Sequence, residues 1–245
     1  MKNKRLILHI GLPKTGSTSF QATLRQASEN NLLESVEYPL IDSKMFYEQI
    51  ESGNAGRLGH YVRHTKIADL DSTEVERRFL EIENARKFPD RALLLSYEGF
   101  WPAKEENLNV LRDIFKQYDY DLEMLCSVRN FPDLWRSALS QHIRHHYTTP
   151  SALETLNLYV KRSKYWLAGD FPVQIVAHKN DVLSAMYTAI GENPAIISLV
   201  KSSRLNEKLT SSEALLLGRI RNVVAEPVQT MIRISNELRL SLIHI

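Results

Sequence analysis

Three observations in the sequence predict an α/β fold in which a mostly parallel sheet has helices on both faces. Short apolar runs at 6–10, 92–96 and 122–128 alternate with segments of helical periodicity, as in strands joined by crossover helices. The run at 92–96 is nearly free of polar residues, which is expected of a strand buried on both faces. A glycine turn joins the first run directly to a helical segment.

The elements follow from these patterns in chain order. A capping box opens the helix near residue 73, and a second capping box at 210–213 opens a late helical region that is interrupted at Pro227. We expect strands at 6–10, 92–96, 122–128 and 173–177, helices at 17–29, 73–87, 105–117, 132–146, 151–164 and 180–190, and an irregular segment at 30–71.

Composition limits the class of protein. The chain has 245 residues, 43% hydrophobic and 24% charged, and no Pro/Gly/Ser-rich linker divides it, so we expect one enzyme-like domain over 1–245. A net charge of +2 with dispersed basic residues argues against nucleic acid as a partner. No apolar run approaches the roughly 18 residues of a membrane helix, so we expect no integral membrane segment and a cytoplasmic location.

The turn from Gly11 to Thr18 is the most informative stretch. Its glycines let backbone N–H groups face an anion at a helix N-terminus, as in a phosphate loop (P-loop). In the ATP-binding pattern a lysine follows the second glycine, but Ser17 stands there and Lys14 lies within the turn. The turn therefore predicts phosphate binding of a kind that differs from an ATPase.

Pro-Lys-Thr-Gly-Ser-Thr after an apolar strand resembles the 5'-phosphosulfate loop of sulfotransferases, which use adenosine 3'-phosphate 5'-phosphosulfate (PAPS) as sulfuryl donor. The resemblance implies that Lys14 contacts the 5'-phosphate and the bridging oxygen of the leaving group, which departs as adenosine 3',5'-bisphosphate. By the same resemblance the PAPS-binding residues of the loop are Pro13, Lys14, Thr15, Gly16, Ser17 and Thr18.

A second motif supports the first. Arg129 follows a predicted strand and Ser137 lies eight residues later in a predicted helix, so both side chains can face one anion. This spacing resembles the family's 3'-phosphate motif, although Pro132 stands one place later than in many members. The segment 96–100 also resembles the Ser-x-Glu-Gly segment of bacterial sulfotransferases and their carbohydrate-modifying relatives, and a weaker likeness lies at 204–211.

Sulfuryl transfer explains why we expect no metal. A transferring sulfuryl group carries one negative charge where a phosphoryl group carries about two, so a lysine and backbone amides can stabilise the leaving phosphate. The acceptor's proton still needs a general base. Glu98, at the end of a predicted strand, and His60, in the segment 30–71, are both candidates, and the sequence does not decide between them.

Two other functions remain open from the sequence. One is a P-loop phosphotransferase using ATP and Mg²⁺, such as a small kinase, and the other is a nucleotide-binding sensor without catalytic activity. By resemblance we expect a bacterial enzyme whose acceptor is a hydroxyl of a sugar or glycoconjugate, followed by a phenol, alcohol or amine. The oligomeric state is not predicted.

Overall fold

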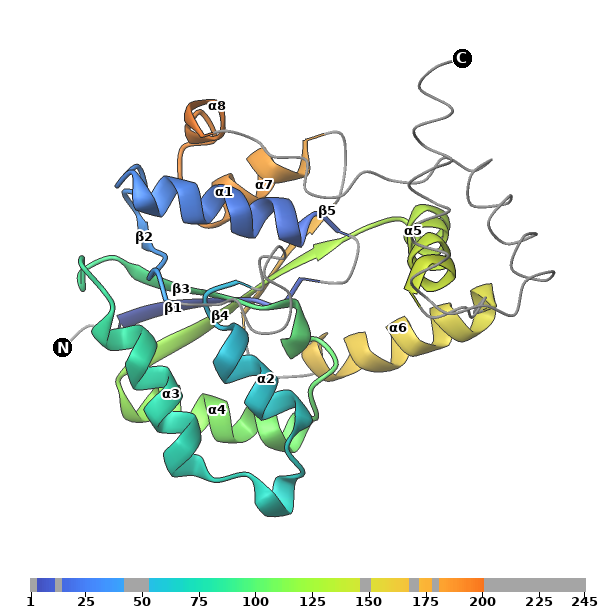
Figure 1. Cartoon of the computed structure of the whole chain (residues 1–245), viewed down its shortest axis with the longest axis horizontal. Helices are drawn as coiled ribbons and strands as arrows, with labels where there is room; N and C mark the ends of the chain where they lie inside the picture. The colour runs from blue at the N-terminus through green and yellow to red at the C-terminus, as the bar shows by residue number, and fades with distance from the viewer. Residues whose placement is uncertain are drawn as a thin grey trace. The chain divides into compact units, whose positions relative to one another are not determined.

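The computed structural model describes residues 4–11, 15–41, 53–145, 151–167, 172–177 and 181–200. These residues form a five-stranded sheet in the order β2-β3-β1-β4-β5, in which every pair of neighbouring strands is parallel (Figure 1). The strands are β1 (Lys4–His9), β2 (Val36–Glu37), β3 (Ala92–Ser96), β4 (Tyr120–Val128) and β5 (Val173–Ala177).

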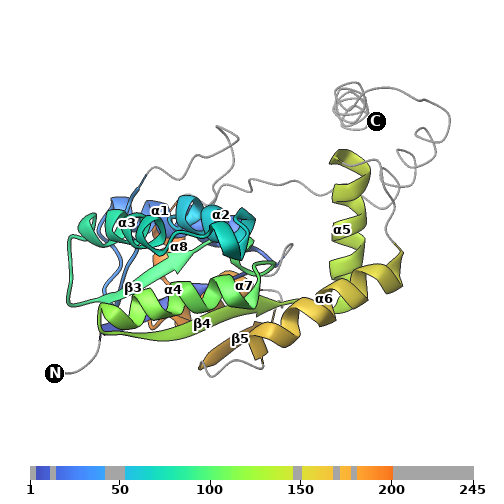
Figure 2. The ribbon, with the colours of Figure 1, turned by 90° about the horizontal axis from the view of Figure 1, so that it is seen from below.

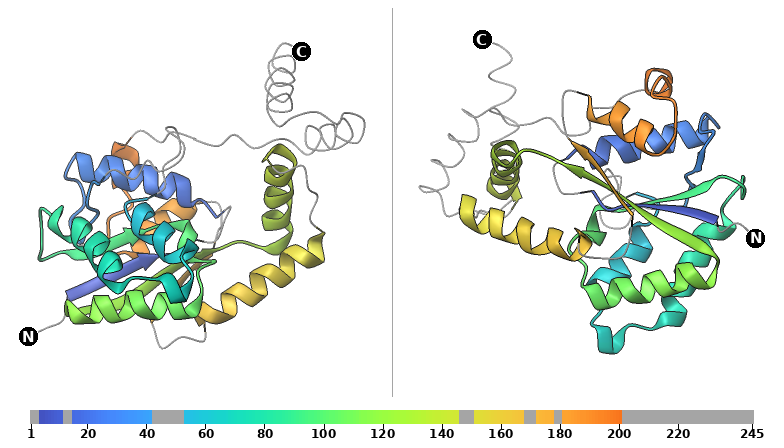
Figure 3. Two further views of the ribbon diagram at one scale, coloured as in Figure 1. Left: turned by 60° about the horizontal axis from the view of Figure 1, so that its bottom comes forward. Right: turned by 180° about the vertical axis from the view of Figure 1, so that it is seen from behind.

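Helices cover both faces of this sheet, which confirms the predicted fold class. One face carries α1 (Ser17–Glu29), α7 (Val182–Ala189) and α8 (Ile196–Leu199), and the other carries α2 (Gly56–His64), α3 (Ser72–Asn84) and α4 (Glu105–Gln117) (Figures 1 and 3). Figure 2 shows α4 running along β4. Apolar side chains of α1, α7 and the strands form one buried core, which includes Ile7, Phe20, Leu24, Leu94, Leu125, Met186 and Tyr187.

Several predicted boundaries agree with the structure, and one cap does not. The helices 17–29 and 105–117 and the strands 92–96 and 173–177 have the expected bounds. The helix expected from the capping box at Thr73 is α3, but its N-cap is Asp71, whose side chain accepts a hydrogen bond from Thr73 N. Asp71 caps the helix two residues before Thr73 because its carboxylate accepts from a free N–H of the first turn.

The expectation of an irregular segment at 30–71 is wrong. Besides β2, the segment contains α2 and the 3₁₀ helix η1 (Ile67–Asp69). The prediction failed because Gly56 and Gly59 weaken helix propensity. Gly59 is required for packing, since a Cβ there would lie only 2.2 Å from Cδ1 of Tyr97. Contact with Tyr97 therefore outweighs the poor local propensity of α2.

The chain's contacts divide it into two compact units. The first comprises Met1–Arg129 and Lys161–Leu205, and the second comprises Asn130–Val160 and Asn206–Ile245. The sheet belongs to the first unit and α5 (Phe131–His145) to the second, while α6 (Ala152–Leu167) begins in the second and ends in the first. Within the first unit, Trp166 Nε1 donates to Trp101 O at 3.0 Å. The capping box at 210–213 and Pro227 lie outside the described residues.

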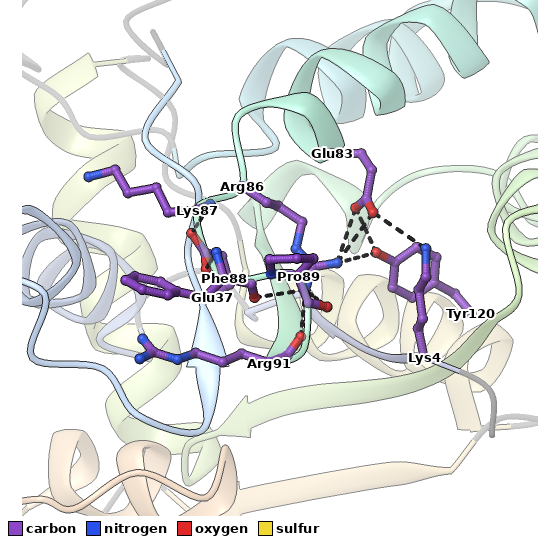
Figure 4. Close-up of polar contacts among 9 residues, drawn as sticks. All are labelled: Lys4, Glu37, Glu83, Arg86, Lys87, Phe88, Pro89, Arg91 and Tyr120. Atoms are coloured by element: carbon purple, nitrogen blue, oxygen red, sulfur yellow. Dashed lines mark hydrogen bonds and ion pairs between the residues drawn. The ribbon is translucent and has the colours of Figure 1, made fainter. Parts of the chain in front are cut away.

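The amino edge of the sheet, where β1, β3 and β4 begin, carries a cluster of bonded polar side chains (Figure 4). Tyr120 donates to Glu83 at 2.6 Å, and Lys4 lies 3.7 Å from the same carboxylate. Arg86 bonds to Glu83 and Tyr120 and also donates to Pro89 O at 2.8 Å. This network joins the end of α3 to β1, to β4 and to the loop before β3.

Candidate functional site

The carboxyl ends of three neighbouring strands meet at the opposite edge of the sheet. β1 lies between β3 and β4, and His9 is in register with Ser96 and with Leu125. Tyr97 N donates to His9 O at 3.2 Å, so the backbone after β3 is bonded to the end of β1. Ligands of open parallel sheets bind at this edge, and the glycine turn leaves β1 there.

The turn leads into α1 through a glycine in the left-handed region. Gly16 has φ 92° and is the N-cap of α1, and its carbonyl accepts from Phe20 N at 3.0 Å. The side chain of Thr15 is buried and shares a 2.6 Å hydrogen bond with Ser127 at the end of β4. Of the predicted loop residues, Thr15 therefore anchors the turn to β4, whereas Pro13 and Lys14 lie outside the described residues.

Ser17 and Thr18 form the first turn of α1. The hydroxyl of Ser17 is buried and has no hydrogen-bond partner among the residues that the structure describes. Gly11 is adjacent, because a Cβ on Gly11 would lie 2.1 Å from Ser17 Oγ. The absence of a side chain at Gly11 thus leaves space for the hydroxyl of Ser17. This hydroxyl and the free backbone N–H groups of the first turn lie at the N-terminus of α1, the positive end of the helix dipole.

Sequence reasoning missed a second polar residue at this place. His9 is fully buried in β1, and its Nδ1 lies 2.7 Å from Ser96 Oγ, while Nε2 is without a partner in the described part of the chain. Burial lowers the pKa of His9 to about 3, so the imidazole is neutral at ordinary pH. The signal in the sequence was a single polar residue inside the apolar run 6–10.

The segment after β3 places the carboxylate candidate Glu98 near this edge. Glu98 opens the 3₁₀ helix η2 (Glu98–Phe100), and its side chain is half-buried. The ring of Tyr97 packs between two glycines, since a Cβ on Gly59 or Gly99 would lie 2.2 Å or 2.1 Å from its ring carbons. Burial raises the pKa of Tyr97, while Arg63 acts in the opposite direction.

The histidine candidate lies on α2, which starts beside the end of β3. Ala55 N donates to Ser96 O at 3.2 Å, and Ser96 N donates to Asn54 Oδ1 at 2.9 Å, so the start of α2 is attached to this edge. The rings of His60 and His64 are 4.3 Å apart between centroids. Burial, and then the neighbouring His64, lowers the pKa of His60, which keeps it unprotonated at neutral pH as a base must be.

The two residues of the predicted 3'-phosphate motif belong to different compact units. Arg129 is the last residue of the first unit and directly follows β4, so it lies at the carboxyl edge. Ser137 lies in α5 of the second unit, and the expected pairing of their side chains stays a prediction.

The described part of the chain therefore brings together a glycine turn, the N-terminus of α1 and buried polar groups at the end of a parallel sheet. Among those residues, no group of three or more His, Cys, Asp or Glu side chains is arranged to hold a metal ion, and no helix is long and apolar enough to cross a membrane. No protein-family model matches the chain, and no curated protein matches its sequence significantly. The described residues define an α/β protein with a parallel sheet, and ligands of such sheets bind at the carboxyl edge where these groups lie.

Proposed function

We propose that this chain is a PAPS-dependent sulfotransferase. The observation that supports the proposal best is Ser17, which stands where an ATP-binding loop has its lysine. Its hydroxyl is buried at the N-terminus of α1 and has no partner within the described ranges. Such a site can bind a phosphate oxygen through neutral donors, which suits a transferring group with one negative charge.

In the proposed reaction, the acceptor oxygen attacks the sulfur of PAPS, and the bond from sulfur to the bridging oxygen breaks. The leaving oxygen keeps the bonding electrons and departs with adenosine 3',5'-bisphosphate. Lys14, Ser17 and the N–H groups at the start of α1 would stabilise the charge that develops there. Glu98 or His60 would take the acceptor's proton. The resemblance also suggests a cytoplasmic bacterial enzyme and a hydroxyl of a sugar or glycoconjugate as acceptor.

Nucleotide choice tests this proposal. Adenosine 3',5'-bisphosphate should raise the melting temperature without Mg²⁺, since binding to the native state contributes about 2.7 kcal/mol at a hundredfold excess over Kd. ATP with Mg²⁺ should have a much smaller effect. A strong Mg²⁺-dependent response to ATP alone would instead support the kinase, and binding with no sulfate transfer across a panel of glycans, phenols and amines would support the sensor.

Arg129 provides a second arm of the same experiment. Arg129→Ala should weaken adenosine 3',5'-bisphosphate by about tenfold or more and leave adenosine 5'-phosphate nearly unchanged, because a charge-assisted bond of about 1.5–3 kcal/mol is lost only with the 3'-phosphate. Arg112→Ala, on α4, is the matched arginine control. Ser137→Ala should act in the same direction with a smaller effect. Equal losses for both nucleotides would exclude the predicted 3'-phosphate motif.

A further inference from the structure

A chain of buried hydrogen bonds fixes the side chain of His9 at the end of β1. Gln21 Nε2 donates to Ser96 Oγ at 3.0 Å, and Ser96 Oγ lies 2.7 Å from His9 Nδ1. All three side chains are buried, and the ring of His9 packs edge-on against Phe20 with 5.1 Å between ring centroids. The imidazole therefore has a fixed orientation between β1, β3 and α1.

These bonds determine which ring nitrogen carries the proton. Ser96 Oγ accepts from the amide of Gln21, and its own hydrogen needs an acceptor in a buried place. Among the described residues, the other partner of Ser96 Oγ is His9 Nδ1. The arrangement that satisfies Ser96 has its hydroxyl donating to Nδ1, which leaves the proton of the neutral ring on Nε2.

The Nε2–H of His9 then faces the same small space as the hydroxyl of Ser17. A Cβ on Gly11 would lie 3.0 Å from His9 Nε2 and 2.1 Å from Ser17 Oγ. Both atoms are buried, and within the described ranges neither has a hydrogen-bond partner. A buried donor without a partner destabilises the fold, so two of them beside a helix N-terminus indicate a ligand that accepts hydrogen bonds.

We propose that His9 Nε2–H and the Ser17 hydroxyl donate to oxygens of the same bound oxyanion, a phosphate or sulfuryl group. His9 is then a binding residue of the anion site, and Gly11 is needed because any side chain there would close the space between donor and ligand. The inference rests on the proposed function for its natural ligand. It differs from the ordinary expectation for a buried histidine, which is a purely structural role.

A pair of substitutions separates the two ring nitrogens. The amide of His9→Gln reaches approximately the position of Nε2, and that of His9→Asn approximately the position of Nδ1. In calorimetric titrations with adenosine 5'-phosphate and with inorganic phosphate, His9→Asn should bind each anion about tenfold or more weakly, because a bond to a charged acceptor is lost. His9→Gln should bind within about threefold of the wild type.

Thr23→Val is the structural control, since it removes a buried hydroxyl of α1 that donates to Phe20 O. This variant should lower the melting temperature without changing anion affinity. Equal affinities in folded His9→Gln and His9→Asn would overturn the inference. If His9→Asn does not fold, long-range ¹H–¹⁵N spectra of the wild type decide the matter. An Nε2-bound proton whose shift changes on adding adenosine 5'-phosphate supports the inference, and a protonated Nδ1 overturns it.

The same titrations distinguish this inference from the proposed function. Binding of inorganic phosphate that depends on His9, without binding of any adenosine nucleotide, would support the anion site and overturn the sulfotransferase proposal. Binding of adenosine 3',5'-bisphosphate with equal affinity in both His9 variants would be compatible with the proposed function and would overturn the role of His9. If the protein binds none of these anions, both the proposed function and the role of His9 are overturned.

Discussion

At the amino edge of the sheet, Glu83, Arg86 and Tyr120 bond to one another, and within the described residues Arg86 Nε is the buried nitrogen of this network without a partner. At the carboxyl edge, His9 Nε2 and Ser17 Oγ lie beside the same glycine, and neither has a partner in the described part of the chain. Both sets of groups are largely buried, and both come from segments attached to β1, β3 or β4. A buried polar group without a partner destabilises a fold by about 1–3 kcal/mol. The amino edge is held mainly by bonded pairs, whereas the two unpartnered groups at the carboxyl edge lie together, as the proposed anion site requires.

The largest expected effect is at the amino edge. The side chain of Arg86 is only 2% exposed and is bonded to Glu83, Tyr120 and the carbonyl of Pro89. Arg86→Ala would remove the guanidinium from Glu83, which keeps Tyr120 and Lys4, and would leave the carbonyls of Pro89 and Arg91 without this donor. We therefore expect the free energy of unfolding, measured in urea, to fall by about 3–5 kcal/mol. Adenosine 3',5'-bisphosphate affinity of the folded fraction should not change.

Arg77→Ala is the control for that substitution. Arg77 bonds to Glu74 and Glu81 on the exposed side of α3, where water replaces lost ion pairs, so stability should change little. A native-like stability of Arg86→Ala would mean that the amino-edge network contributes no more than a surface ion pair. The comparison between the two edges would then fail.

The next largest effect is expected in catalysis at the carboxyl edge. If Glu98 is the general base, Glu98→Gln should lose at least about a hundredfold in kcat while keeping its affinity for adenosine 3',5'-bisphosphate. His60→Ala should then raise mainly the KM of the acceptor. Steady-state assays of sulfate transfer measure kcat and the KM of the acceptor, with Glu106→Gln on α4 as the control. An active Glu98→Gln combined with a collapse of kcat in His60→Ala would assign the base to α2.

The fold was predictable from the sequence because its strands and most of its helices are locally consistent. The run 92–96 is apolar up to Ser96, and helix 17–29 follows a glycine turn, so their local patterns agree with the tertiary structure. The helix α2 was not predictable in this way. Gly59 lowers helix propensity, and the reason for a glycine there is the ring of Tyr97, which lies 38 residues further along the chain.

The candidate site was predictable in part for a similar reason. The turn around Gly16 and Ser17 is contiguous in sequence, and its spacing indicates an anion at a helix N-terminus. His9 could not be assigned, because its role depends on Ser96 and Gln21, which come from separate elements. Patterns within one segment can therefore be predicted from the sequence. A hydrogen-bond chain across β1, β3 and α1 can be identified only when the three-dimensional structure is known.

The smallest expected effect tests whether His9 is kept neutral at the carboxyl edge. Its ordinary pKa is 6.5 and burial lowers it to about 3, so between these values the unfolded chain binds a proton that the folded chain does not. Stability therefore falls as pH falls below 6.5, and from pH 7.5 to 5.5 His9 should contribute a loss of about 1.4 kcal/mol. The described contacts of the ring are Ser96 and Phe20, which do not titrate in this range.

Urea unfolding of His9→Gln should lack this loss of stability, whereas His64→Gln, an exposed position on α2, should retain it. An unchanged pH dependence in His9→Gln would show that the pKa of His9 is the same in the folded and the unfolded chain. The carboxyl edge would then carry a charge below about pH 6.5, as the amino edge does, and the two edges would differ less than the hydrogen bonds indicate.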